Sequence, residues 1–457
     1  MTKALNYFKS KRIIIILLIL IFSAFTGIWN IVSGGYDKQN KIILFVKKII
    51  PNTVSRKVRD VVFIIPDLKE RNDFLSTQVN KHEQGLEGQL FNEEIILSKK
   101  NKKEYLLKEF FLPFPRLDTR LGWASTKNSQ RAHHFAFVGK EVIVISGEGK
   151  TIYFEKNNIL KGKLNQKEIA NNIDNILKKS NSELIGIRDL FAEDNKIFIS
   201  LISKNSKGLT INAYSADINL KKIEFETFFE TKEYWKQYNV FSGGRFSSYK
   251  NNMILFTTGF SNKDKVSQQL DSLLGKIIAI DKKTKAHKII SMGHRNPQGL
   301  SYIKKSNIIF NTEHGPKGGD EINVNFQKDG EISNFGWDVA SYGVPYTDPI
   351  NPYKTSHAEY GFVEPLKYYV PSIGISQMVY MPKNLNYEKG EYLYVSSLRA
   401  GSIYVIKVDK NFNKIIDEDR IFFKSKRIRD IMYDKENNVF FLIFEFTPSI
   451  GILKLNK

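Results

Sequence analysis

The stretches MILFTT (residues 253–258) and GKIIAID (residues 275–281) form the pattern that decides the fold. The first is short and apolar, and the second starts with Gly and alternates apolar with polar positions, as in an antiparallel hairpin. Strands like the first recur at six places: VIVIS from Val142, IFIS from Ile197, MILFTT from Met253, IIFNT from Ile308, YLYVSS from Tyr392 and VFFLI from Val439. Successive copies begin 47 to 56 residues apart, except across one interval of 84 residues. A repeat of this length predicts four-stranded blades, so we expect an all-β, six-bladed β-propeller.

The long interval contains SYGVPYTDPINPYK, residues 341–354. Its density of Gly and Pro is incompatible with a central strand and predicts a long loop on one face of the propeller. We therefore assign residues 111–457 to the propeller. Residues 34–110 fit the repeat poorly and are interpreted as a stalk or cap, with a hairpin in EEIILSKKNKKEYLLKEFF.

The composition excludes several classes of protein. There is no Cys among the 457 residues, which removes disulfide frameworks, thiolate zinc sites and Cys nucleophiles. The net charge of +21 is spread along the chain as Lys in turns. Because we find no recognition helix, zinc-finger spacing or arginine-rich tail, we expect no nucleic-acid partner and interpret the charge as a basic, soluble surface.

The N-terminus carries a run of about 20 apolar residues, residues 13–32, long enough to cross a bilayer as a helix. It is preceded by four cations, Lys3, Lys9, Lys11 and Arg12. The positive-inside rule therefore places the N-terminus in the cytoplasm, and we interpret residues 1–33 as a cytoplasmic tip followed by a membrane anchor. The propeller is then expected in the periplasm or another extracytoplasmic space. A cleaved signal peptide is the alternative, and both interpretations export the propeller.

Residues 293–337 are unusually rich in Gly, Pro, His, Asn and acids. The sequence HGPKGGDE places free backbone carbonyls beside two carboxylates, which are the hard oxygen ligands that Ca²⁺ prefers. A turn whose acids bind its own amides is the other interpretation. Near the C-terminus, Arg427 and Arg429 stand two apart on a predicted strand and share a face. They would repel each other unless an anion lies between them; a solvated strand edge is the alternative.

In this order, GHRNPQGL, EHGPKGGDEIN, NFGW, SYG, SSLRAGSIYVIK and RIRD resemble the soluble glucose and aldose sugar dehydrogenases that depend on pyrroloquinoline quinone (PQQ). The resemblance runs from about Leu184 to the end, and that family's fold is also a six-bladed propeller. It implies PQQ and Ca²⁺ as cofactors. The residues that it implies for PQQ are Arg295, Asn296, Gln298, Arg427 and Arg429. Those that it implies for calcium are the carbonyls of Gly315 and Pro316 over the quinone, and Asp320 and Glu321 near a second ion.

Three positions depart from the family pattern. The family's general base is a His, but the matching segment NVFSGGRF has Phe241 there, and Phe accepts no proton. Arg399 stands where the family has a Lys that contacts the cofactor. Asn181 aligns with a Gln that lies on the substrate side in the family. His133, His134 and Asp189 are the candidates for a replacement base, although a strand-end pair without chemistry is the simpler interpretation of the two histidines.

The resemblance implies an exported enzyme that oxidises a sugar or a related alcohol and passes electrons to a membrane or soluble acceptor. A non-catalytic propeller that binds a sugar or a partner protein is the second hypothesis, and Phe241 is its main support. A calcium-dependent lactonase or esterase shares the architecture, but it requires a His near a central ion, and the sequence does not place one.

Overall fold

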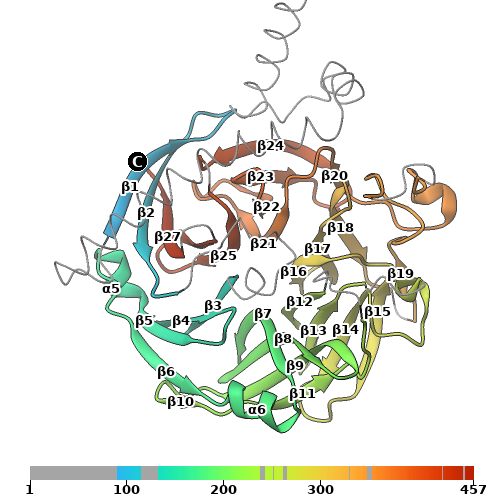
Figure 1. Ribbon diagram of the computed structural model, residues 1–457. Coiled ribbons are helices and arrows are strands. Elements are labelled where there is room, and N and C mark those ends of the chain that lie inside the picture. Colours follow the sequence, from blue (N-terminus) through green and yellow to red (C-terminus); the bar gives the residue numbers. More distant parts are fainter. Residues whose placement is uncertain are drawn as a thin grey trace, which may run out of the picture. The chain divides into compact units, whose positions relative to one another are not determined.

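The computed structural model describes residues 90–114, 132–236, 242–250, 252–260, 265–328, 330–346, 352–424, 426–445 and 448–456. These residues form six antiparallel sheets around an axis, as Figure 1 shows. The prediction of an all-β, six-bladed propeller is thereby confirmed. The predicted membrane helix, residues 13–32, lies outside the described residues. Within them, no helix has the length and apolar character needed to cross a membrane.

One edge strand of each sheet is the innermost and lies next to the axis. The six inner strands, which number blades one to six in turn, are β3 (His133–Val138), β7 (Glu183–Glu193), β12 (Gly243–Tyr249), β16 (Pro297–Ile303), β21 (Ile375–Lys383) and β25 (Ile428–Asp434). Each pairs antiparallel with the strand that follows it. All six inner strands therefore run in the same direction, so their first residues gather at one end of the axis.

The second strands are those that the sequence repeat predicts: β4 (Glu141–Ser146), β8 (Lys196–Asn205), β13 (Met253–Thr258), β17 (Ile308–Glu313), β22 (Lys389–Ser397) and β26 (Val439–Phe444). In β17 and β26 every residue is buried. Both faces of a second strand are covered because each blade packs between two others, and this is why these strands are continuous apolar runs. One apolar cluster between blades five and six joins Tyr394 to Phe440 and Leu442.

The third strands complete the hairpins that the sequence predicts. They are β5 (Thr151–Glu155), β9 (Gly208–Asp217), β14 (Lys276–Asp281), β18 (Asp320–Phe326), β23 (Ser402–Val408) and β27 (Ser449–Leu455). The outer strands are β6 (Lys167–Asn171), β11 (Glu226–Glu230), β15 (His287–Met292), β20 (Lys367–Tyr369) and β24 (Ile415–Phe422) for blades one to five. Two-residue strands, β10 (Lys222–Ile223) and β19 (Ser333–Asn334), add parallel edges to blades one and three.

Blade six contains both ends of the described chain. Its outer strands are β2 (Glu104–Phe111) and β1 (Leu90–Leu97), and β2 pairs with β27 from Tyr105 opposite Leu455 to Phe111 opposite Ser449. The hairpin that the sequence predicts in this region is therefore present. However, it belongs to the ring and closes it, so the propeller includes residues from Leu90 onward, upstream of residue 111. This corrects the boundary of the segment interpreted as a stalk or cap.

Short helices and loops fill the remaining connections. Two helices, α5 (Lys156–Leu160) and α6 (Ile173–Lys179), lie in the connections of blade one, before and after β6. Between β19 and β20, the described residues form only the 3₁₀ turn Ala358–Tyr360 and isolated bridges. This connection is the long loop that the Gly- and Pro-rich sequence predicts.

The closure of the ring makes a prediction for Leu107 of β2. Its side chain is fully buried in the cluster that includes Ile428 and Leu453. Replacement by Ala should lower the free energy of unfolding in urea by about 2–5 kcal/mol, because the cavity cannot collapse. Ile95→Ala on β1, where the side chain is 49% exposed, should change it by less than about 0.5 kcal/mol. Equal small losses in both variants would show that this hairpin is not part of the folded ring.

Candidate functional site

The predicted cofactor residues of blades four and six lie at the end of the axis where the inner strands begin. Gln298 is the second residue of β16, and Arg429 is the second residue of β25. Arg429 Nη1 donates to Gln298 Oε1 over 2.7 Å, and Gln298 Nε2 donates to Asn296 Oδ1 over 3.0 Å. Asn296 Oδ1 also accepts from the backbone N–H of Gly243 on β12. The structure therefore brings Asn296, Gln298 and Arg429 together across three blades.

The anion that the two arginines require is supplied by the chain itself. Glu445 directly follows β26; its Oε2 accepts from Arg427 Nε over 3.0 Å, and its Oε1 accepts from Arg429 Nε. Burial would raise the pKa of Glu445, but Arg429 and Arg427 lower it to about 2. The carboxylate is ionised at any physiological pH. We did not predict Glu445; the available signal was a single acid directly after an apolar strand.

Arg295, on the connection that leads into β16, is buried against two aromatic rings that also contact each other, Phe260 and Trp337. Its guanidinium carbon lies 5.1 Å from the ring centre of Trp337 and 5.7 Å from that of Phe260. Nη1 donates to the carbonyl of His314 over 2.9 Å. Burial lowers the pKa of Arg295, although Tyr346 and Asp320 oppose the shift. Such an arginine is suited to an anionic, flat ligand.

A small cavity lies beside Arg295. Its lining includes His314, Gly315, Glu321 and Trp337. Within the described part of the chain, the buried indole Nε1 of Trp337 has no hydrogen-bond acceptor. A donor left in this state is costly unless a ligand or water accepts from it. The cavity thus offers a donor and a cation to an acceptor-rich ligand.

The Gly315–Pro316 turn is held tightly in place beside this cavity. A Cβ on Gly315 would come within 2.3 Å of the carbonyl oxygen of Gly318, so no side chain fits. Asp320 fixes the turn: its Oδ1 accepts from Gly315 N–H and from Ser372, and its Oδ2 accepts from Ile375 N–H. Both oxygens of Asp320 are therefore used by protein donors, and the residue joins the turn to blade five.

Glu321 is the less compensated of the two predicted acids. It is 7% exposed, its Oε1 lies 3.6 Å from His357 Nε2, and its Oε2 accepts from Asn323 over 3.4 Å. Burial, together with the charge of Glu313, raises its pKa well above the usual range. A cation beside Glu321 would relieve this penalty.

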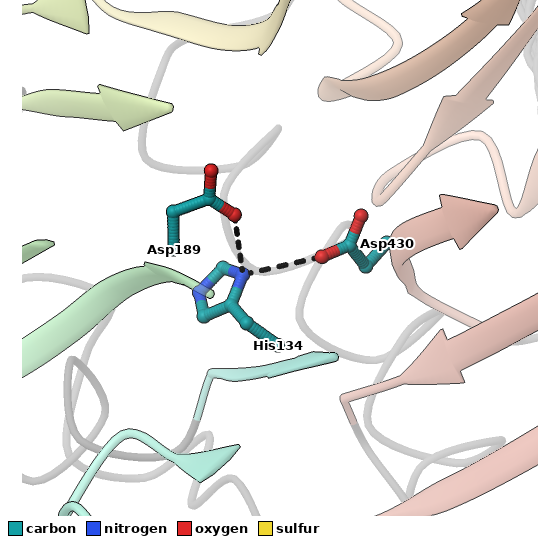
Figure 2. A group of neighbouring side chains, drawn as sticks. All are labelled: His134, Asp189 and Asp430. Carbon is teal, nitrogen blue, oxygen red and sulfur yellow. Dashed lines mark hydrogen bonds and ion pairs between the residues drawn. The ribbon is translucent and has the colours of Figure 1, made fainter. Parts of the chain in front are cut away.

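Deeper along the axis, Figure 2 shows His134, Asp189 and Asp430 pointing toward one another from β3, β7 and β25. Their three ligand atoms lie within 4.8 Å of one another, which is compact enough for a metal ion. However, Arg245 Nη1 on β12 stands 2.7 Å from Asp189 Oδ1, 3.0 Å from Asp430 Oδ2 and 3.3 Å from His134 Nδ1. The guanidinium thus takes the place that a metal would occupy.

Two further contacts of the Arg245 guanidinium are to backbone carbonyls. Nε donates to the carbonyl of Gln298 over 2.7 Å, and Nη2 donates to the carbonyl of Arg429 over 3.2 Å. The double glycine before Arg245 lets β12 approach β7, because a Cβ on Gly244 would lie 2.5 Å from the Cβ of Arg188. Neither the role of Arg245 nor its partner Asp430 was predicted. The GGR sequence was the only local signal.

The hydrogen bonds of this group argue against His134 or Asp189 as the missing base. Burial lowers the pKa of His134 to about 4, and its Nδ1 lies 3.3 Å from Arg245 Nη1 and 3.4 Å from Asp430 Oδ2. Burial raises the pKa of Asp189 to about 7 although Arg245 opposes the shift. Its two oxygens accept from Arg245 and from the backbone N–H of Phe246. The acceptor atoms of both candidates are therefore used within the axis.

The other predicted residues lie apart from this group. His133 is buried on the opposite side of β3 from His134, with its ring against Phe114. Asn181 is exposed in the turn after α6, and Arg399 is exposed in the turn after β22. Phe241 lies outside the described residues.

Comparisons with known proteins agree with the fold. The family model described as glucose/sorbosone dehydrogenase matches residues 132–447. The aldose sugar dehydrogenase YliI of Escherichia coli K12 is 28% identical over 273 residues, covering 56% of this chain and 72% of that protein. A crystal structure of glucose dehydrogenase superposes with a TM-score of 0.59 at 19% identity, covering 72% and 97% of the two chains. The PQQ-bound aldose sugar dehydrogenase of Streptomyces coelicolor does so with a TM-score of 0.51 at 17% identity, covering 77% and 98%.

The axial arginine makes a prediction for stability. Arg245→Met should lower the free energy of unfolding by about 3–5 kcal/mol, because it leaves buried carboxylates without their cation. Combining it with Asp189→Asn should recover part of the loss, since one uncompensated acid is then removed. Guanidinium chloride titrations would measure both. A loss below about 1 kcal/mol in the single variant would contradict the role of Arg245 at the axis.

Proposed function

Because the chain belongs to the glucose/sorbosone dehydrogenase family, we propose that it is a PQQ- and Ca²⁺-dependent dehydrogenase that oxidises a sugar or a related alcohol. The observation that carries the proposal is the convergence of Arg295 and the pair Arg427 and Arg429 at one end of the axis. PQQ is a flat tricarboxylate, and guanidinium groups bind carboxylates with two parallel hydrogen bonds. When bound, the quinone would accept the hydride that leaves the sugar carbon.

The chain's own residues have distinct tasks in this proposal. Arg295, which packs against Trp337 and Phe260, would bind one carboxylate of the cofactor. Gln298 fixes the direction of Arg429 through its 2.7 Å hydrogen bond. Trp337 offers its buried N–H to an acceptor of the ligand. These groups are already held by their neighbours, so little ordering entropy is lost when the ligand binds.

Calcium is the second part of the proposal. The carbonyls of Gly315 and Pro316 are hard oxygen ligands on a turn that cannot accept a side chain, and they adjoin Arg295 through His314. Tyr346 donates to the carbonyl of Pro316 over 3.0 Å, which leaves that oxygen a second lone pair. Glu321, whose ionised form is disfavoured by burial, supports a second cation near it more strongly than the fully hydrogen-bonded Asp320 does.

Export is the third part. The apolar residues 13–32 and the cations before them support a membrane-anchored propeller on the extracytoplasmic side. Added protease should then digest the propeller in spheroplasts, and protection there would refute this part of the proposal.

Binding of PQQ tests the function directly. Purified protein with Ca²⁺ should bind PQQ, seen as a shift in the quinone absorbance, and removal of Ca²⁺ with a chelator should weaken binding. Arg295→Met should weaken it by about 2 kcal/mol or more, because a buried charge partner is lost. Arg420→Met, which removes a buried arginine on the outer strand β24, is the matched control and should leave the affinity unchanged. No PQQ binding by the wild-type protein would overturn the proposal.

Turnover tests the catalytic part separately. With Phe241 at the base position, dye reduction with aldoses should be slow, and Phe241→His should raise it by about 10²–10⁴-fold, the usual effect of a positioned base. The PQQ affinity should stay the same, since Phe241 supplies no charge. PQQ binding without turnover in both forms would instead favour a non-catalytic binding propeller.

A further inference from the structure

We infer that Glu445 is a positioning residue of the cofactor site: its carboxylate holds Arg427 and Arg429 side by side, with their donors aimed before the ligand arrives. The inference rests on the proposed function, in that PQQ is taken as the ligand. Glu445 is not itself a ligand-binding group, since an anion would repel the carboxylates of PQQ. Its effect must pass through the two arginines.

Backbone and side-chain contacts both fix Glu445. Its N–H donates to the carbonyl of Arg427 over 3.0 Å, at the edge where β26 ends opposite the start of β25. Its side chain is 3% exposed and reaches Arg427 with one oxygen and Arg429 with the other. The arginine side chains are 14% and 15% exposed. The carboxylate is thus buried beneath two cations that still reach the site.

The charge balance explains why an internal carboxylate is needed there. Two guanidinium groups on one face of a strand repel each other, and partial burial makes the repulsion stronger. Glu445 leaves the group of three with one net positive charge and stays ionised because its pKa is lowered by the two arginines against the effect of burial. The pair can therefore stay ordered without a ligand and still attract an anion.

Glu445 also acts beyond blade six. Arg429 is held from one side by Glu445 and from the other by Gln298 Oε1, and Gln298 in turn binds Asn296. These contacts fix the direction of the guanidinium from two blades. Loss of Glu445 would release one side of Arg429 and remove the link between the two arginines.

Glu445→Gln separates positioning from net charge, because the two effects have opposite signs. If only net charge mattered, removal of a negative charge from an anion site would tighten PQQ binding. A glutamine amide accepts at one end and donates at the other, so it can accept from one arginine only and meets the other N–H donor to donor. Under the positioning role, affinity falls although the site becomes more positive.

The test compares PQQ affinity in Glu445→Gln, Glu109→Gln and wild-type protein, measured by the absorbance of the quinone. Glu109 is the matched control: it is 1% exposed and pairs with Lys426 over 2.7 Å on the outer strand β2. We expect Glu445→Gln to raise the dissociation constant by about tenfold or more, the effect of losing preorganisation, and Glu109→Gln to leave it unchanged. An unchanged or tighter affinity in Glu445→Gln would overturn the inference.

A crystal structure of Glu445→Gln without cofactor tests the same inference independently of PQQ. We expect Arg427 and Arg429 to separate and the Arg429–Gln298 hydrogen bond to be lost. Arginine positions unchanged from those described above would overturn the role of Glu445. Failure of the wild-type protein to bind PQQ is a different outcome: it would overturn the proposed function, while the crystal structure would still decide whether Glu445 positions the arginines.

Discussion

One guanidinium group holds the axis of this propeller together. Arg245 extends from β12 and contacts Asp189 on β7, Asp430 on β25, His134 on β3 and the carbonyl of Gln298 on β16. Five of the six inner strands therefore meet at one side chain. Burying such a charge is costly, and the cost is offset only when its donors find well-placed acceptors. The inner strands must consequently keep one mutual register, and that register determines where the site residues above them lie.

The same guanidinium connects the axis to the proposed cofactor site. It binds the backbone carbonyls of Gln298 and Arg429, and the side chains of these two residues bind each other. The backbone of the site is thus fixed from within the ring, while Glu445 fixes the side chains of Arg427 and Arg429 from the edge of blade six. This gives the site two independent supports, one for strand position and one for side-chain direction.

Features that depend on neighbouring residues, such as strands and short motifs, could be predicted from the sequence. Contacts between segments that lie far apart in the chain could not. The six second strands were predictable because burial on both faces makes each of them a continuous apolar run. The place of β1 and β2 in blade six was not, because β2 finds its partner β27 more than 330 residues along the chain. The same holds in the site: Arg295, Asn296 and Gln298 form a readable motif, whereas the contacts of Arg245 with Asp430 and of Arg429 with Gln298 join different blades and leave no local pattern.

The position of Phe241 in the chain suggests why binding and turnover can separate in this fold. Phe241 precedes Arg245 by four residues and Gly243 by two, and both of those residues are tied into the axis or the site. The glycines and Arg245 are constrained by packing between β12 and β7 whether or not the protein turns over a substrate. The resemblance places the general base at residue 241, and a proton acceptor serves the reaction. Under the proposed function, a Phe at this position removes the proton acceptor, while Arg295, Arg427 and Arg429 are present in the sequence. The arginine site therefore bears on ligand binding. The rate of the proposed oxidation depends on residue 241, a separate position in the sequence.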